Sequence, residues 1–243
     1  MPSPPPSRPP RRIPAMAGIS LLGLGLGVGF PAAQSLERRV VPGEAVAIYD
    51  LAGRVTVEPA SGADVVVEIT RGGADGGRLR IQQGALAGWQ TLRIIFPSDR
   101  VVYRQPGAWG SQVEVCDDGR FDDQTLLHID AARHRVLISG RGPGLDAHAD
   151  LRVRVPAGRK LALFLAVGAA TITNIDGNLR VSAASASVTT RNTRGSLAVE
   201  SGSGELRVRD ASGRVTLDTG SGRVHVRGVR GERLRLATGS GGV

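Results

Sequence analysis

Apolar residues recur at every ninth position through the last third of the chain. The first series consists of Ala170, Leu179, Val188, Leu197, Leu206, Val215 and Val224, and after one inserted residue it resumes at Leu234 and Val243. A second series lies two residues further on and consists of Ile172, Val181, Thr190, Val199, Val208, Leu217, Val226 and Leu236. Two inward side chains separated by one outward side chain are typical of a short β-strand. The pattern therefore predicts short strands separated by turns of about five residues.

The turns between these strands alternate between two kinds, so the structural repeat is eighteen residues long. One kind contains a glycine, at Gly177, Gly195, Gly213 and Gly231. The other is a tetrad of small residues, at Ser201–Gly204, Thr219–Gly222 and Thr238–Gly241. Glycine at every equivalent corner indicates a backbone that adopts positive φ or passes close to the neighbouring turn.

These features predict an all-β fold, a β-solenoid with about 18 residues and two short strands per turn. Each strand would pair in parallel with the strand eighteen residues away, which places Leu206 between Val188 and Val224 in one inner column. The alternative is a β-sandwich, in which neighbours nine residues apart would pair antiparallel. A sandwich does not require the same turn residues every eighteen positions, so the solenoid is favoured.

Stability in such a fold comes from the contacts between turns, because one turn buries too few apolar side chains to offset its own backbone entropy. The ends of the stack then need caps. The sequence stops at Val243, in the middle of a repeat. We expect either that the sequence is a fragment or that another chain covers this end, which makes self-association through the uncapped C-terminal end one expected partner interaction.

The same apolar-x-apolar pattern continues less regularly through the first part of the chain. The pairs are Val46/Ile48, Val55/Val57, Val65/Val67, Leu79/Ile81, Leu92/Ile94, Val113/Val115, Leu127/Ile129, Val136/Ile138, Val153/Val155 and Leu161/Leu163. No segment has the pattern of a good helix. We expect an irregular β-rich part over 40–150 and regular repeats over 151–243. The main interruption, 97–123, contains Tyr103 and Trp109 and ends in the acidic run Asp117–Asp123.

The first 33 residues resemble a secretory signal peptide. Arg8, Arg11 and Arg12 precede an apolar stretch over 18–30, and a small-residue exit follows. We expect export to the periplasm, the cell surface or the medium; the alternative is an uncleaved membrane anchor. Cys116 is the single cysteine, so an intrachain disulfide is excluded, and a buried inert thiol is favoured over an intermolecular bridge.

The chain resembles the bacterial putative adhesin family built on β-strand repeats, a domain of unknown function numbered 4097. The resemblance rests on three features: Val41-Pro42-Gly43 with the segment Asp50–Val55, the segment Val155–Gly158, and the recurrent Ser/Thr-Gly-Ser-Gly and Gly-x-Leu-x-Val units. It covers about 40–243. It implies an exported or envelope-associated β-solenoid without an established enzymatic activity, and it supplies no catalytic motif.

Motifs for catalysis, cofactors or metals are weak throughout. The tetrad Thr219–Gly222 is rich in glycine, but no lysine or helix follows it as in a phosphate loop. The serines Ser203, Ser221 and Ser240 recur in every coil, unlike a nucleophile. The pairs His128/Asp130 and His148/Asp150 share strand faces but lack further ligands, and the Asp117–Asp123 run lacks calcium-loop spacing. We therefore expect no catalytic residue, no cofactor and no metal.

Arginines provide the most specific candidate site. Thr173, Arg191, Arg209 and Arg227 are spaced eighteen residues apart on the outward side, and a neighbouring column holds Thr171, Thr189, Arg207 and His225. Stacked strands lie about 4.8 Å apart, so the arginines would repel one another unless Glu205, Asp210 or Asp218 neutralises them. Without such neutralisation, Arg191, Arg207, Arg209 and Arg227 form a candidate polyanion-binding site. The alternative is a solvated face in an arginine-rich protein whose net charge is +9.

The sequence leaves three functions open. We expect an exported non-enzymatic surface or matrix interaction protein, an adhesin; the first alternative is a module that binds acidic envelope or extracellular polysaccharide through these arginines. The third is a carbohydrate-active solenoid enzyme, for which Glu200 and Asp218 are the candidate paired carboxylates. Ser182 and Ala237 occupy the equivalent positions in the neighbouring turns, which disfavours the enzyme. Nucleic acid is not an expected partner, because aromatic residues are scarce.

Overall fold

The structure is a computed structural model that describes residues 36–104, 110–122 and 132–242. Residues 34–243 form one compact unit, which is the unit discussed below. The predicted signal peptide, Trp109, the strand at Leu127/Ile129 and the pair His128/Asp130 lie outside the described residues.

The described part of the chain is all-β, as predicted. Its strands are β1 (Leu36–Val41), β2 (Ala45–Ala60), β3 (Val65–Gly72), β4 (Arg80–Leu86), β5 (Trp89–Ile95), β6 (Arg100–Val102), β7 (Ser111–Cys116), β8 (Arg133–Ser139), β9 (Leu145–Asp146), β10 (His148–Pro156), β11 (Arg159–Thr173), β12 (Asp176–Ala183), β13 (Ser187–Ser201), β14 (Leu206–Thr219), β15 (Val224–Arg227) and β16 (Arg230–Thr238). One 3₁₀ turn, η1 (Gly76–Arg78), is the single helical element among the described residues. None of these residues forms a helix with the length and apolar character needed to span a membrane.

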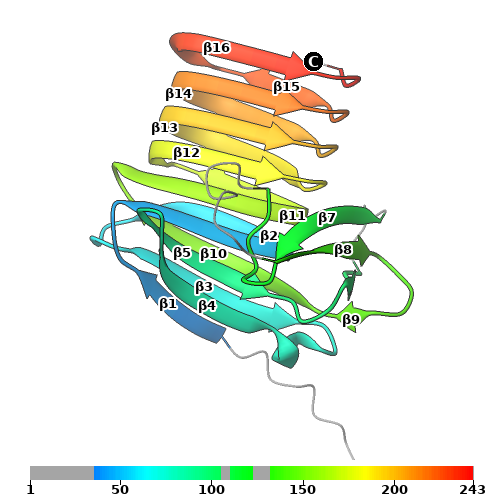
Figure 1. Cartoon of the computed structure of the whole chain (residues 1–243). Coiled ribbons are helices and arrows are strands. Elements are labelled where there is room, and N and C mark those ends of the chain that lie inside the picture. The colour runs from blue at the N-terminus through cyan, green and yellow to red at the C-terminus, as the bar shows by residue number, and fades with distance from the viewer. Residues whose placement is uncertain (1–35, 105–109, 123–131, 243) are drawn as a thin grey trace, which may run out of the picture. The chain divides into compact units, whose positions relative to one another are not determined.

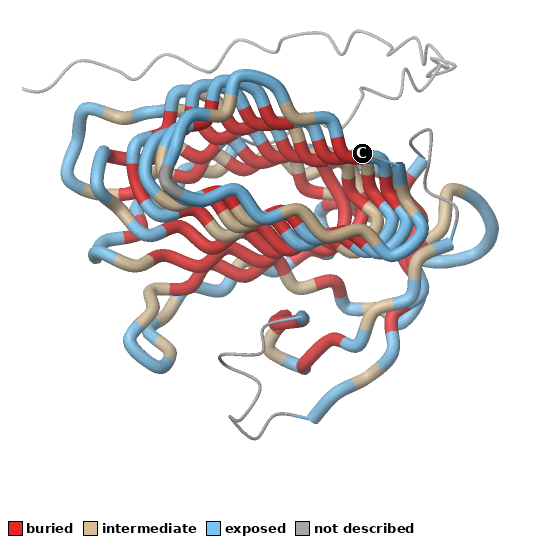
Figure 2. Tube along the Cα trace, turned by 90° about the horizontal axis from the view of Figure 1, so that it is seen from above, coloured by how far each residue is buried: buried red, intermediate tan, exposed pale blue. Residues whose placement is uncertain are grey.

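Strands β11 to β16 stack in parallel along the C-terminal part of the unit (Figure 1). Residues of β13 pair with residues of β14 eighteen positions later, so that Val188 lies beside Leu206, and Leu206 in turn lies beside Val224 of β15. The predicted parallel pairing at eighteen residues is therefore observed in this part of the chain, and the antiparallel pairing at nine is not. Most residues of the two apolar series are buried, and the buried positions follow one another from coil to coil (Figure 2).

The predicted two short strands per turn are wrong for β13 and β14, which run through the glycine-containing corner as single long, bent strands. A left-handed residue turns the chain at this corner, and φ is 57° at Asn174, 52° at Asn192 and 54° at Asp210. Gly228 occupies the same position in the last coil, with φ 69°. The Asn192 amide donates to Asn174 Oδ1 over 2.8 Å, which joins two neighbouring corners. In β13 and β14 the ladder resumes directly on both sides of this residue, so these strands are not interrupted, whereas β11 ends at Thr173 and β12 begins at Asp176.

Glycines at the same corner allow neighbouring coils to approach closely. A Cβ atom added to Gly195 would lie 2.4 Å from the carbonyl oxygen of Gly177, and one added to Gly213 would lie 2.0 Å from that of Gly195. Both glycines also have positive φ, at 98° and 109°. At Gly195 and Gly213 the predicted glycine column thus serves both of the roles expected of it.

We predict that Gly195→Ala destabilises the protein by more than about 4 kcal/mol or prevents folding, because the methyl group collides with backbone of the preceding coil. Gly142→Ala is the matched control: Gly142 has φ 100°, nearly that of Gly195, but no atom lies within 4 Å of its added Cβ. The control should lose only the cost of backbone strain, about 1–2 kcal/mol. Denaturant unfolding of both variants measures the difference, and equal losses would contradict the close-approach argument.

The inserted residue of the last repeat is accommodated by a bulge. Ser212 pairs with Arg230 at the usual offset, whereas Arg214 pairs with Arg233, one residue later. Beyond this point the apolar series is no longer covered, and Leu234 is 47% exposed.

The N-terminal half is less regular, and its strands β1 to β5 and β10 belong to the same sheet as the C-terminal strands. Strand β2 pairs in parallel with β11, β10 and β5, while β1, β3 and β10 pair antiparallel in that order. A second sheet has the order β7-β8-β6-β9. Its connection to the main core includes Phe121, whose ring lies 6.2 Å from that of Tyr49 in an edge arrangement, while Tyr49 stacks on Phe164 at 4.5 Å.

A carboxyl group is buried in the middle of β2. Asp50 is fully buried, its Oδ1 accepts a 3.3 Å hydrogen bond from the Ala52 N–H, and its Oδ2 has no hydrogen-bond partner among the described residues. Burial raises the pKa of Asp50 well above its usual range, and the charge of Asp150 raises it further. Ionised Asp50 therefore destabilises the fold.

We predict that the isosteric change Asp50→Asn stabilises the protein at neutral pH. Because the pKa of Asp50 is higher in the folded than in the unfolded chain, its contribution to stability falls as pH rises from about 3.9, the usual pKa of aspartate, up to the raised folded-state value. The free energy of unfolding of the wild type relative to Asp50→Asn, measured from pH 4 to pH 8, should decrease with pH. A constant difference would contradict this assignment.

Candidate functional site

The arginine column, defined here as Arg191, Arg209 and Arg227, lies on the outer face of strands β13, β14 and β15. Arg191 pairs with Arg209 and Arg209 with Arg227 across the parallel ladder, and Thr173 of β11 precedes them in the same row. All three arginines are exposed. The structure therefore brings together the three outward arginines that the sequence placed in one column.

Side chains alternate between the two faces along each strand, and this alternation directs the arginine side chains outward. Thr190 and Val208, which immediately precede Arg191 and Arg209 in sequence, are buried in the core, so each arginine side chain faces solvent. The neighbouring outward row runs through Thr171, Thr189, Arg207 and His225, as predicted. Arg207 thus lies beside the arginine column and not within it.

Counter-charges distinguish the two rows. Glu205 Oε1 lies 2.8 Å from Arg207 Nη2 and 3.1 Å from His225 Nε2. No carboxylate of the described residues forms an ion pair with Arg191, Arg209 or Arg227, so Asp210 and Asp218 do not neutralise them as the sequence had left open. Of the predicted polyanion-binding residues, Arg207 is paired and the other three keep exposed, unneutralised charge.

Two arginines elsewhere on the same sheet face, Arg152 and Arg154, have carboxylate partners. Arg152 lies in the row of Arg207, linked through the pairs Thr189–Thr171, Thr171–Thr56 and Thr56–Arg152. The Arg152 Nε lies 2.8 Å from Glu58 Oε1, and hydrogen bonding with this guanidinium lowers the pKa of Glu58. Arg154 also binds Glu58, at 3.1 Å, and Glu68, at 3.1 Å.

Stacked guanidinium groups at the strand spacing of about 4.8 Å repel one another by roughly 1 kcal/mol or less per pair in water. This cost is small enough for the fold to carry. A polymer with anionic groups along its length would convert the repulsion into several simultaneous charge-assisted hydrogen bonds. The arrangement is therefore suited chemically to binding a linear anion.

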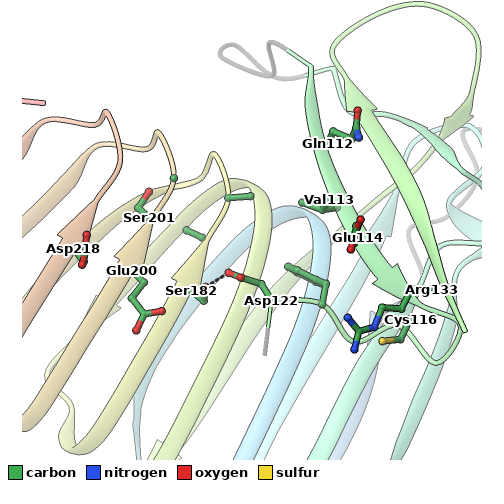
Figure 3. Close-up of a pocket in the computed structure, with 14 residues that line it drawn as sticks. Gln112, Val113, Glu114, Cys116, Asp122, Arg133, Ser182, Glu200, Ser201 and Asp218 are labelled. Carbon is green, nitrogen blue, oxygen red and sulfur yellow. Dashed lines mark hydrogen bonds between the residues drawn. The ribbon is translucent and has the colours of Figure 1, made fainter. Parts of the chain in front are cut away.

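A separate cleft of about 760 Å³ lies between β7 and the ends of strands β12, β13 and β14 (Figure 3). Ser182, Glu200 and Asp218 are register partners on the three stacked strands and form one wall. Across the cleft, Glu114 projects from β7. Asp122 accepts a hydrogen bond from the Ser182 hydroxyl, which joins the acidic turn to the stack.

The two carboxylates considered for an enzyme therefore do lie on adjacent strands of one cleft. Asp218 is exposed, and the Glu200 side chain is 49% exposed and lies 3.4 Å from Arg180 Nη2. A general acid usually needs a carboxyl group whose protonated form is favoured by burial. The solvated, arginine-paired setting of Glu200 does not provide such an environment.

The acidic run Asp117–Asp123, which lacks the spacing of a calcium loop, has a structural role among its described residues. Asp118 forms ion pairs with Arg93 at 2.9 Å and Arg120 at 2.8 Å. The side chains of these arginines are only 8% and 3% exposed. A buried guanidinium needs a counter-charge, and Asp118 supplies one to both arginines.

We predict that Asp118→Asn lowers the free energy of unfolding by about 1–3 kcal/mol, because two buried guanidinium groups lose a shared negative charge. Asp117→Asn is the matched control, since the Asp117 side chain is 69% exposed and its ion pair among the described residues is with His134. The control should change stability by less than about 0.5 kcal/mol. Similar losses in thermal or denaturant unfolding would contradict the role of Asp118.

The remaining candidate residues from the sequence take part in packing or in ion pairs within the fold. Cys116 is a free, buried cysteine, and burial raises the pKa of its thiol. His148 packs 5.2 Å from the Tyr103 ring, and Asp150 binds the Arg54 guanidinium at 3.1 Å. Among the residues that the structure describes, no three His, Cys, Asp or Glu side chains lie close enough together to hold a metal ion.

Comparisons with known proteins do not identify a family. No protein-family model matches the chain, and no curated protein matches it. Among solved structures, it is similar to a putative cell adhesion protein from Clostridium sporogenes, with 7% identity and a TM-score of 0.30 over 86% of this chain and 100% of that chain. Similarity at that level carries no functional argument. The resemblance to the adhesin family therefore rests on the sequence motifs alone.

Proposed function

We propose that this protein is an exported, non-enzymatic β-solenoid of the adhesin type that binds linear acidic polymers through the arginine column. In this proposal the leader directs the chain to the periplasm, the cell surface or the medium, and the partner is an envelope or extracellular polysaccharide. Parallel pairing at eighteen residues supports the solenoid architecture.

The observation that carries the binding role is that three exposed arginines stack directly on one another without a carboxylate partner among the described residues. Arg54, Arg152, Arg154 and Arg207 all have a carboxylate within hydrogen-bonding distance. The arginine column has none among the described residues, although its three members stack directly on one another. Solubility does not require the three arginines to be aligned, whereas alignment allows an anionic polymer to contact all three guanidinium groups at once.

A carbohydrate-active enzyme remains the second candidate, favoured by the adjacent positions of Glu200 and Asp218 in the cleft. Their solvent exposure and the Arg180 partner of Glu200 weigh against it. We therefore keep binding without chemistry as the proposal.

We predict that replacing Arg191, Arg209 and Arg227 together by serine weakens retention of residues 34–243 on immobilised heparin and polygalacturonate. The loss should be accompanied by a shallower salt dependence, by up to about three units in the slope of log affinity against log salt. An uncharged polysaccharide matrix serves as the reference for non-electrostatic retention.

The control variant replaces Arg38, Arg80 and Arg141, three exposed arginines that do not stack in one column, by serine. It has the same net charge as the test variant. If both variants lose retention equally, binding depends on overall charge and the proposal is wrong.

A further inference from the structure

His225 lies on β15, on the same outer face as the arginine column and two residues before Arg227. Its side chain is 59% exposed, and its Nε2 lies 3.1 Å from Glu205 Oε1. The same oxygen lies 2.8 Å from Nη2 of Arg207, which is the register partner of His225 on β14. One carboxylate oxygen is therefore shared by a permanent cation and by a side chain whose charge depends on pH.

Arg223 lies two residues before His225 and extends the same row. Its carbonyl oxygen accepts a 2.8 Å hydrogen bond from the Leu206 N–H, so the ladder with β14 already includes this residue. Because Val224 is buried, strand alternation directs Arg223 and His225 to the outer face. Arg223 is exposed and has no ion pair with a carboxylate in the described part of the chain. Together with Arg227, three basic side chains thus follow one another at every second residue.

The middle member of this row changes its chemistry with pH. A neutral imidazole has one N–H donor and one acceptor nitrogen, so that when Nε2–H donates to Glu205, Nδ1 offers only a lone pair, which repels an anion. Protonation makes both nitrogens donors. Nε2 can then keep its contact with Glu205 while Nδ1 donates to an anionic group. The cationic surface then runs from Arg223 to Arg227 without a neutral gap.

The charges around His225 come from its own strand and from β14, the one described strand that pairs with β15. Glu205 favours a positive charge on the imidazole. Four arginines oppose it: Arg207, Arg209, Arg223 and Arg227. A bound polyanion would offset the repulsion from these arginines and so favour the protonated imidazole. Because linkage is reciprocal, protonation then favours binding to the same extent.

We infer that His225 is a pH-dependent contact of the polyanion-binding surface, and that its protonation, which joins Arg223 to the arginine column, tightens binding as pH falls from about 8 to about 5.5. This inference rests on the proposed binding role of the arginine column and adds the regulation of that site. The protein would hold an acidic polymer more firmly in mildly acidic surroundings than at neutral pH.

The test measures the affinity of the wild type, His225→Gln and His134→Gln for soluble dextran sulfate across this pH range at constant ionic strength. Sulfate esters stay ionised throughout, so the charge of the polymer does not change. His134 is the matched control, because its Nδ1 also lies near a carboxylate, 3.3 Å from Asp117 Oδ1, but on β8 of the second sheet. Thermal unfolding at each pH establishes that the proteins are folded.

The wild type and His134→Gln should bind roughly two- to fivefold more tightly at the acidic end of the range, as expected for one added exposed ionic contact. His225→Gln should lose this dependence, because its amide is not protonated. His225→Arg, which carries a permanent charge, should keep the higher affinity at every pH. The wild type should also take up protons on binding, which is measured as a difference in binding enthalpy between buffers of different ionisation enthalpy.

A wild-type affinity that does not change with pH, or a change that persists in His225→Gln, would overturn this inference and leave the binding role intact. Failure of the wild type to bind dextran sulfate at any pH would overturn the proposed function and this inference with it. The two failures are therefore distinguishable.

Discussion

The parallel backbone ladder at an offset of eighteen residues is the constraint on which the rest of this structure depends. Neighbouring coils can pair only if their corners superimpose. At Gly195 and Gly213 this leaves no room for a side chain, because an added Cβ atom would lie 2.4 Å and 2.0 Å from a carbonyl oxygen of the preceding coil. Once the corners superimpose, every other column follows. The inner apolar columns, the left-handed corner at Asn192 and the outward arginines are all consequences of one register.

The same constraint explains why the charged site has its form. Side chains eighteen residues apart are held at the strand spacing whatever their chemistry, so a repeated arginine becomes a straight line of charge. The fold has no freedom to spread these groups apart. A carboxylate that neutralises such a row must then come from a corner residue such as Glu205. Glu205 pairs with Arg207 and His225, and the arginine column is left without a pair among the described residues.

Periodicity allowed the C-terminal architecture and the arginine column to be predicted from the sequence, because in this region spatial neighbours lie at a constant sequence separation. The N-terminal half offers no such rule. Ala45 of β2 pairs with Lys160 of β11, and Ser182 binds Asp122, although these partners are not separated by the eighteen residues of the repeat. The long bent strands were missed because the sequence marks the corner residues but not the continuation of the ladder across them.

The repeat also determines how the length of the arginine column can change in evolution. A duplication of eighteen codons within β13 and β14 would insert a whole coil whose corners match those on either side, and it would lengthen the line of guanidinium groups by one. A deletion of the same size would shorten it by one. Each coil pairs with its neighbour in the same register. The number of arginines offered to the proposed polymer ligand would therefore change by one for each coil added or removed, and no other surface would have to change.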